Sequence, residues 1–258
     1  MSTHYETLQH ADTYREAFAV EPPAALGERH LWPRKPGFFI VHAATATALA
    51  QGPASTVSAV EEAAPATASD TPSDAASTRV LVPAQWGLVP HWVKSASDAK
   101  LRAPKLVNAK SDLASTGTAF RDAWLNGQRC IVPMVAFYED DLRSGKAVPT
   151  RVARVDGKPM GVAGLWARWQ GAGAESGEVI ISYCLLTVNA NNHALLHRYG
   201  QPGSEKSMPA ILNEGAYDAW LTARPDKAKE FMRQYAAEKL TANPVEKKAD
   251  KVPKGWLG

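Results

Sequence analysis

The sequence contains little cysteine and no recognisable metal-binding pattern. Only two cysteines, Cys130 and Cys184, occur among its 258 residues, and each lies within an apolar run. Such cysteines are typical of small buried side chains in a reducing compartment rather than of a disulfide. Since no CxxC pair or His/Cys cluster is present either, the sequence predicts no disulfide and no bound metal or cofactor.

Long apolar runs and a strong excess of charge are also lacking. No segment approaches the roughly 18 uninterrupted apolar residues that a membrane span needs, and the opening MSTHYETLQH has neither the basic region nor the apolar region of a secretory signal. The formal net charge of +3 is too small to establish a nucleic-acid partner, which usually requires a concentrated basic patch. These absences favour a cytoplasmic protein without a membrane partner.

What the sequence does contain is enough apolar material for a core, with 45% apolar residues and 8 tryptophans. Strand-like segments predominate, and most connections between them are too short for parallel crossovers. The predicted fold is therefore α+β, a single domain with a curved, mostly antiparallel, barrel-like β core flanked by short helices. Strands are expected at 37–43, 78–90, 129–139, 150–156, 160–169 and 179–188, and helices at 10–20, 116–127, 189–199 and 214–224.

Two segments differ in composition from the rest. Residues 44–78 consist almost wholly of Ala, Ser, Thr, Pro and a few acids, which predicts a disordered insertion because too little apolar surface is available to offset the ordering entropy. Residues 223–258 contain PDKAKEFMRQYAAEKL and then KKADKVPK. The first of these predicts an amphipathic helix with proline in its first turn, and the second a basic tail. The main domain is expected to span 1–222.

Three short stretches place polar groups in apolar or tightly turned sequence. LVNAKSD contains Asn108 and Lys110, VAFYEDD contains Glu139 at the end of an apolar strand, and NNHALLHRYGQPGSEKSMPAIL contains His193 and His197. Each has an ordinary explanation: a capping Asn, a solvated strand end and surface histidines. Their order along the chain is more informative than any one of them.

Five segments in this order resemble the SOS response-associated peptidase (SRAP) family. They match its W-G-L-(apolar)-P-x-W segment, its N-A-R-x-E element, its R-C-(apolar)-P…F-Y-E strand, its A-G-(apolar)-W strand and its closing T-x-x-A-N…H-x-R-M-P-(apolar)-L element. The corresponding segments here are WGLVPHW (86–92), LVNAKSD (106–112), RCIVP to FYE (129–139), AGLW (163–166), and TVNAN to MPAIL (187–212). The resemblance covers most of residues 1–222.

The resemblance implies a specific reaction. Members of this family recognise abasic sites in single-stranded DNA and attach to them covalently through the cysteine exposed when the initiator Met is removed. The α-amine of that cysteine condenses with the sugar aldehyde, and its thiol closes a thiazolidine; the peptidase in the family name is best understood as self-removal of the N-terminal Met. For this chain, it implies a monomer that binds single-stranded DNA containing abasic sites and associates with the nucleoid when bound.

The family's site residues carry over position by position. Position 2 is Ser2 rather than Cys, so the amine is retained and the thiol is not. Asn108 would position the amine or sugar, and Glu139 would shuttle protons. The family's histidine aligns with Glu205, with His197 upstream as the alternative. The expected DNA contacts are His4 in place of the family's Arg, Trp92 as a base-stacking ring, and Lys110 and Arg198 near phosphates.

Two other interpretations remain open at this point. The missing cysteine, the missing Arg at position 4 and the displaced histidine also fit a homologue that has lost the reaction and acts as a non-covalent DNA-binding or interaction module. A peptidase acting on other proteins finds little support, because no separate nucleophile with a base and an orienting partner is evident.

Overall fold

The computed structural model describes residues 3–51, 78–172 and 177–245. Its centre is a barrel of five strands in which β4, β3, β6, β9 and β10 pair in turn, and β10 returns to β4 to close the ring. Every pairing in the ring is antiparallel except that between β10 and β4. The strands are β3 (Pro36–His42), β4 (Arg79–Trp86), β6 (Arg129–Met134), β9 (Met160–Gln170) and β10 (Val179–Asn189). The predicted α+β fold with a barrel-like core is confirmed.

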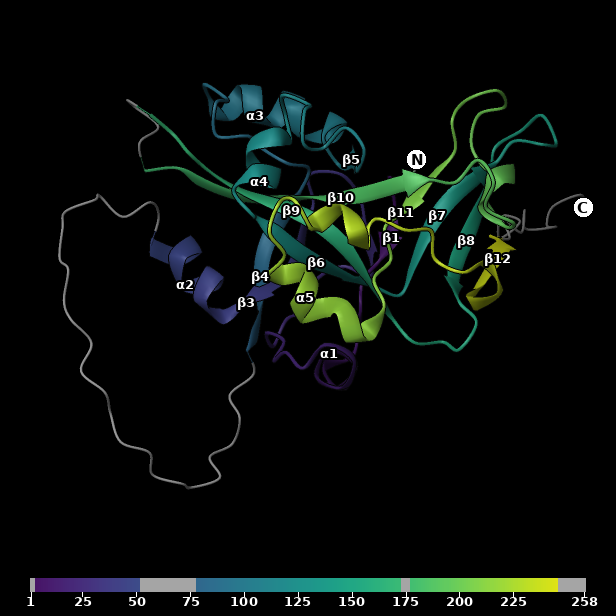
Figure 1. Cartoon of the computed structure of the whole chain (residues 1–258), viewed down its shortest axis with the longest axis horizontal. Helices are drawn as coiled ribbons and strands as arrows, with labels where there is room; N and C mark the ends of the chain where they lie inside the picture. The colour runs from purple at the N-terminus through teal and green to yellow at the C-terminus, as the bar shows by residue number, and fades with distance from the viewer. Residues whose placement is uncertain (1–2, 52–77, 173–176, 246–258) are drawn as a thin grey trace, which may run out of the picture.

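A second, fully antiparallel sheet lies beside the barrel, at the right of Figure 1, in the order β12, β8, β7, β1, β2. Its strands are β1 (Tyr5–Glu6), β2 (His30–Leu31), β7 (Ala136–Asp141), β8 (Val148–Arg154) and β12 (Leu240–Pro244). Two short strands extend β10 beyond the barrel: β5 (Asn108–Lys110), which runs parallel to it, and β11 (Ser207–Pro209), which runs antiparallel. This extension brings β5 and β11 towards the second sheet.

The helices are short and lie outside the sheets (Figure 1). The α-helices are α1 (Ala11–Phe18), α2 (Ala43–Gln51), α3 (Ala96–Arg102), α4 (Arg121–Leu125) and α5 (Tyr217–Leu221). The 3₁₀ turns are η1 (Ala103–Lys105), η3 (Leu196–Arg198), η4 (Glu214–Ala216), η5 (Ala228–Phe231) and η6 (Ala237–Lys239). No helix among the described residues is long and apolar enough to cross a membrane.

Both cysteines are buried in the barrel, unpaired, as the sequence predicts. Gly164 of β9 lies between them, and a Cβ at that position would come within 2.7 Å of the Cys184 carbonyl oxygen and 2.9 Å of the Cys130 Sγ. Burial raises the pKa of Cys184 to about 12 and that of Cys130 well above its ordinary value. Neither thiol is therefore available as a thiolate nucleophile.

The N-terminal strand is fixed to both sheets. Tyr5 pairs with Phe137 of β7 and with Leu31 of β2, while its hydroxyl shares a buried 2.5 Å hydrogen bond with the hydroxyl of Tyr183 in the barrel. Gly37 makes room for this bond, since a Cβ there would lie 2.4 Å from the Tyr183 oxygen. A two-residue strand is weak on its own, so these contacts explain why the chain near its N-terminus is held in place.

The predicted helix within residues 225–240 is wrong. Two 3₁₀ turns, η5 and η6, stand in its place, and β12 follows them and pairs with β8 from Leu240–Arg154 to Pro244–Thr150. β8 would otherwise be an open edge with unpaired backbone groups. Covering that edge outweighs the local helical preference of this segment. The basic tail beyond residue 245 lies outside the described residues.

The predicted helix at 189–199 is also wrong, apart from the η3 turn. Asn189 accepts a hydrogen bond from the backbone N–H of Asn191 (2.9 Å), and the Nδ1 atom of buried His193 accepts the N–H groups of Leu195 and Leu196. Side chains thus take donors that a helix would satisfy with carbonyl groups. His193 is consequently a structural residue, and its Nε2 donates to the Tyr235 carbonyl at 2.8 Å.

The prediction of disorder is wrong for the first part of the 44–78 segment. Residues Ala43–Gln51 form helix α2, which is consistent with the high helix propensity of alanine, and Leu49 is buried against the core. The remainder of the insertion, 52–77, lies outside the described residues. Elsewhere the expected segments at 10–20, 37–43, 150–156, 160–169 and 179–188 match α1, β3, β8, β9 and β10.

Candidate functional site

The N-terminal strand leads into a cavity that contains Glu139. β1 lies antiparallel to β7, and the His4 carbonyl accepts the backbone N–H of Tyr138 at 3.1 Å. Thr3, His4 and Glu139 together line a cavity of about 320 Å³. Glu139 itself is buried, with 8% of its surface exposed. The first described residue of the chain therefore lies in the same cavity as this carboxylate.

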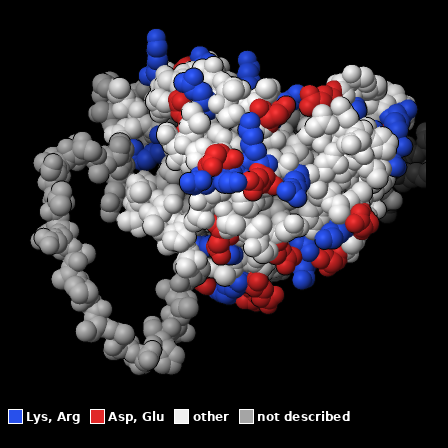
Figure 2. Space-filling view, viewed as in Figure 1, with Lys and Arg blue, Asp and Glu red and all other residues white. Residues whose placement is uncertain are grey.

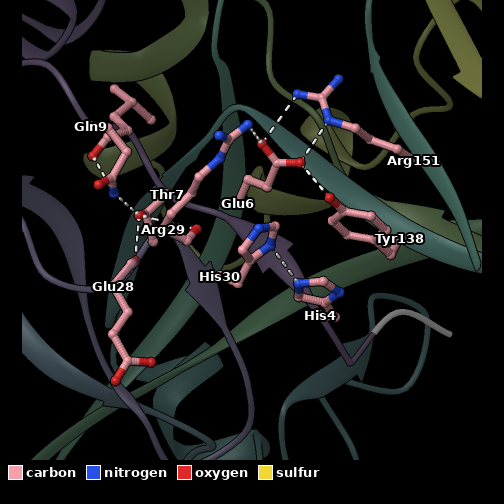
Figure 3. A network of polar contacts seen from close by, with 10 residues as sticks. His4, Glu6, Thr7, Gln9, Glu28, Arg29, His30, Tyr138 and Arg151 are labelled. Carbon is pink, nitrogen blue, oxygen red and sulfur yellow. Dashed lines mark hydrogen bonds and ion pairs between the residues drawn. The ribbon is translucent and has the colours of Figure 1, made fainter. Parts of the chain in front are cut away.

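A buried carboxylate, Glu6, fixes this end of the strand (Figure 3). It accepts hydrogen bonds from Arg151 at 2.6 Å, from Arg29 at 3.2 Å and from the Tyr138 hydroxyl. Burial raises the pKa of Glu6, but the bonds from Arg151, Tyr138 and Arg29 outweigh it and bring that pKa to about 2. Glu6 is thus ionised at neutral pH and holds three elements, β1, β7 and β8, together.

His4 stands in a stack of three rings at the mouth of this cavity. Its imidazole is nearly parallel to Trp32 on one side and to Tyr138 on the other, with ring centroids 4.0 Å apart in both cases. Its Nε2 lies 3.0 Å from Nδ1 of His30 (Figure 3). Burial and the neighbouring His30 lower the pKa of His4 to about 4. His4 is therefore neutral at pH 7 and cannot replace the positive charge of an arginine.

Glu139 also borders a second, smaller cavity of about 90 Å³, together with Glu205. The two cavities adjoin, because Gly200 and Gln201 line both of them. Glu205 accepts a hydrogen bond from Lys110 at 2.6 Å. This bond and the charge of Lys110 lower the pKa of Glu205 below its ordinary value. The structure thus places two carboxylates around one space, with a lysine beside the second.

Asn108 and Lys110 reach this region through β5. Their strand pairs with β10, with Asn108 opposite Leu185 and Lys110 opposite Thr187. Residues two apart on a strand share a face, so Asn108 lies on the same side of β5 as Lys110. Asn108 is half-buried and does not line either of the two cavities.

The comparisons with known proteins identify the family. A family model described as SOS response associated peptidase (SRAP) matches residues 3–252. The chain belongs to the SRAP family. It is 28% identical over 191 residues to the abasic site processing protein HMCES of Gallus gallus, a match that covers 66% of this chain and 53% of that protein. The chain thus spans about half the length of this vertebrate relative.

A bacterial relative and two solved structures extend the SRAP comparison. The abasic site processing protein YobE of Bacillus subtilis is 25% identical over 165 residues, 62% of this chain and 68% of YobE. A crystal structure of a Bordetella bronchiseptica protein is 35% identical and superposes with a TM-score of 0.76 over 95% of this chain and 99% of that one. A Bacteroides thetaiotaomicron structure, 20% identical with a TM-score of 0.69 over 95% and 92% of the two chains, shows the shared fold.

The residues marked by the SRAP motifs do not all lie together. Glu139, Glu205 and Lys110 lie around the adjoining cavities, whereas His197 is on the exposed side of η3, its Nδ1 bonded to the His193 carbonyl at 2.8 Å. Arg198 is exposed beside it and contributes positive charge near Asp141. Ser2 lies outside the described residues.

Trp92 belongs to a separate surface near α3. It is half-exposed, its indole N–H donates to the Thr118 carbonyl at 3.3 Å, and the Arg102 guanidinium lies 5.2 Å from its ring.

The face in Figure 2 carries both signs of charge interspersed, not one broad basic surface. No group of three or more His, Cys, Asp or Glu side chains within the described ranges is placed to hold a metal ion.

The sequence alone does not identify Glu6, Trp32 or Tyr138 as site residues. Tyr138 lies inside the FYE motif, next to Glu139, but the motif does not show its bond to Glu6. Glu6 carries no motif, and its partners Arg29 and Arg151 are 23 and 145 positions away. Only the pairing of β1 with β7 and β2 brings these residues together, and a two-residue strand leaves no periodic signal in the sequence.

Proposed function

We propose that this SRAP protein binds single-stranded DNA at abasic sites and forms a covalent adduct through the α-amine of Ser2 after removal of the initiator Met. The observation that supports it most is the shared cavity of Thr3 and Glu139, because Ser2 precedes Thr3 by one peptide unit, about 3.8 Å between Cα atoms. The relatives named as abasic site processing proteins support the choice of substrate.

The reaction is a condensation between an amine and an aldehyde. An α-amine has a pKa of about 7.7–8.0, so a useful fraction is neutral and nucleophilic at pH 7. The amine nitrogen attacks C1′ of the ring-opened sugar to give a carbinolamine. Protonation of the carbinolamine hydroxyl and departure of water then give a protonated imine. The serine hydroxyl adds reversibly to this imine, so the adduct stays in exchange with free aldehyde.

The two carboxylates have distinct parts in this proposal. Glu139, which lines the cavity with Thr3, takes a proton from the attacking amine while solvent water protonates the alkoxide, and then gives its proton to the hydroxyl, which leaves as water. Glu205, on the other side of Glu139, stabilises the positive charge of the imine, and Lys110 keeps Glu205 ionised. Asn108, on the same face of β5 as Lys110 and outside the lining of both cavities, helps to position the strand that carries the sugar. Arg198 and the exposed side of Lys110 face the phosphates of the strand, and Trp92 is a candidate for a more distant base contact.

Borohydride trapping tests this function. The protein, mixed with a single-stranded oligonucleotide carrying one abasic site and then reduced, should give a covalent species whose tryptic N-terminal peptide carries the sugar remnant on the amine of Ser2. The same strand with thymine at that position is the control and should give none. A remnant on Lys110, or no trapped species at all, would contradict the proposal.

Replacing Glu205 should show which residue fills the place of the family's histidine. We expect Glu205→Gln to slow imine formation about tenfold or more, because it removes the negative charge that stabilises the imine. His197→Gln removes a side chain that lines neither cavity and should change the rate less than about twofold. Single-turnover trapping at saturating DNA measures both, and the opposite ranking would assign the role to His197.

A further inference from the structure

Trp32 is a large apolar side chain left open to solvent beside the proposed reaction site. Its exposed fraction is 48%, the highest of any tryptophan within the described residues, and it lines the cavity of about 320 Å³ together with Thr3 and Glu139. Ligand pockets are lined predominantly by hydrophobic and aromatic side chains, with a few polar groups that orient the ligand. As an exposed ring in the lining of this cavity, Trp32 is a candidate ligand contact.

The backbone around Trp32 is rigid. The Trp32 carbonyl accepts the N–H of Lys35 at 3.1 Å and so closes a tight turn. Two further bonds tie this turn to the barrel: Arg34 N–H to the Trp86 carbonyl at 2.7 Å, and Trp86 N–H to the Lys35 carbonyl at 3.1 Å. Arg34 adopts a left-handed conformation with φ 70° to allow this. The indole is thus presented by a turn that is fixed before any ligand arrives.

The inner face of the indole is also fixed. It stacks on His4, which stacks on Tyr138, with interplanar angles of only 10° and 9°. The far ring is held by the Tyr138 hydroxyl, which donates to Glu6. Because His4 covers one face of the indole, the exposed surface of Trp32 includes its other face. The stack therefore ends in a flat, open and preorganised ring.

We propose that the outer face of Trp32 stacks on the nucleobase next to the abasic site and sets the register of the DNA strand in the cavity. This rests on the proposed function, since it concerns the same substrate. An abasic nucleotide has no base of its own, so the neighbouring bases must supply the stacking energy and the positioning. Arg34 and Lys35 follow in the same turn and bring positive charge near the ring for the adjoining phosphates, with Lys35 also 3.6 Å from Glu28.

A flat neutral base matches this surface better than a phosphate does. His4 is neutral at pH 7, and Trp32 and Tyr138 are uncharged, so the stack offers no cation to a phosphate. Stacking on an aromatic ring tolerates every base. The chain should therefore discriminate weakly among neighbouring bases, but strongly between a strand that has a base at this position and one that lacks it.

The test uses the full chain and single-stranded 11-mers with a central tetrahydrofuran abasic analogue, which cannot form an imine. At each flanking position, the strand carries either 2-aminopurine or a second abasic analogue. In the wild type, we expect one flanking 2-aminopurine to be quenched on binding, and removal of that base to weaken binding about tenfold. Trp32→Leu should abolish the quenching and bind both strands with the same weakened affinity, while Trp32→Phe retains most of the effect.

Two rival outcomes would overturn the assignment. Quenching and affinity unchanged in Trp32→Leu would remove Trp32 from the site, and loss of both in Trp92→Leu alone would assign the base to Trp92. Leu101→Ala, an exposed apolar change on α3, controls for general surface effects. Borohydride trapping of a true abasic strand by the wild type is measured in parallel. Trapping without a Trp32 effect refutes only the stacking site, whereas absence of trapping refutes the covalent function.

Discussion

Replacing Ser2 with cysteine should convert a reversible adduct into one that survives denaturation without borohydride. The thiol of Ser2→Cys can add to the imine and close a thiazolidine, whereas the wild-type hydroxyl gives at best a readily hydrolysed oxazolidine. We expect the half-life of the adduct to increase about a hundredfold or more, because sulfur is the far better nucleophile near neutral pH. Denaturing gel electrophoresis after incubation with abasic single-stranded DNA measures the surviving fraction over time.

The natural thiols do not interfere with this experiment. Cys130 and Cys184 are buried in the barrel, and burial raises the pKa of both. Ser204→Cys is a matched control, because Ser204 lines the smaller cavity with Glu139 and Glu205 but has no α-amine beside its side chain. A thiol without that amine gives only a reversible adduct with the aldehyde, so Ser204→Cys should leave no stable band.

The result also separates the covalent protein from a decayed homologue. A stable adduct with Ser2→Cys means that the carboxylates and the cavity are competent and that only the sulfur is missing. If Ser2→Cys binds abasic single-stranded DNA but gives no adduct, the site has lost its reaction, and the chain is a non-covalent DNA-binding module. Retention of the initiator Met must be checked by intact mass in both proteins, because a blocked amine gives the same negative result.

The barrel could be predicted from sequence because its strands carry their own signal. β3 in the barrel, like β8 in the second sheet, combines apolar or alternating residues with turn residues on both sides, and this pattern suffices for a strand. The segment of β12 carries a helical pattern instead. Its pairing with β8 is a long-range contact, and such contacts override local preference without leaving a trace in composition.

The candidate site could be predicted only where a motif marked it. Glu139 and Asn108 were found through their neighbours in sequence, and Glu205 through its distance from Met208. His4 was expected at the DNA, but its neutrality and its place between two rings depend on Trp32 and Tyr138, which are 28 and 134 positions away. Charge and stacking at a site are properties of the surroundings in space, which one sequence does not display.

Glu6→Gln should be the most destabilising single change among the polar residues of the site. The Glu6 side chain is only 3% exposed and accepts bonds from Arg151, Arg29 and Tyr138. Removing its charge leaves Arg151, 31% exposed, without its counter-ion. We expect the free energy of unfolding to fall by about 3 kcal/mol. Glu21→Gln, which breaks an exposed pair with Arg15, should cost less than about 1 kcal/mol.

The pH dependence of this loss of unfolding free energy shows whether the charge of Glu6 is its cause. The pKa of Glu6 is about 2 in the folded state against an ordinary 4.5, so its contribution is fully present above pH 4.5 and is lost as the pH falls from 4.5 towards 2. The difference in unfolding free energy between wild type and Glu6→Gln should therefore be constant from pH 7 to 5 and shrink below 4.5. Urea unfolding at each pH measures it.

A difference that stays constant down to pH 3 would show that Glu6 acts by packing and not by charge. Glu6→Gln should also affect the reaction, because Glu6 lies on β1, four residues from the proposed amine. Weakening the contacts of Glu6 with β7 and β8 frees this strand to move away from Glu139, so Glu6→Gln should also slow borohydride trapping, whereas Glu21→Gln should not. Loss of stability without any change in trapping would mean that the bonds from Tyr5 alone hold the amine in the cavity.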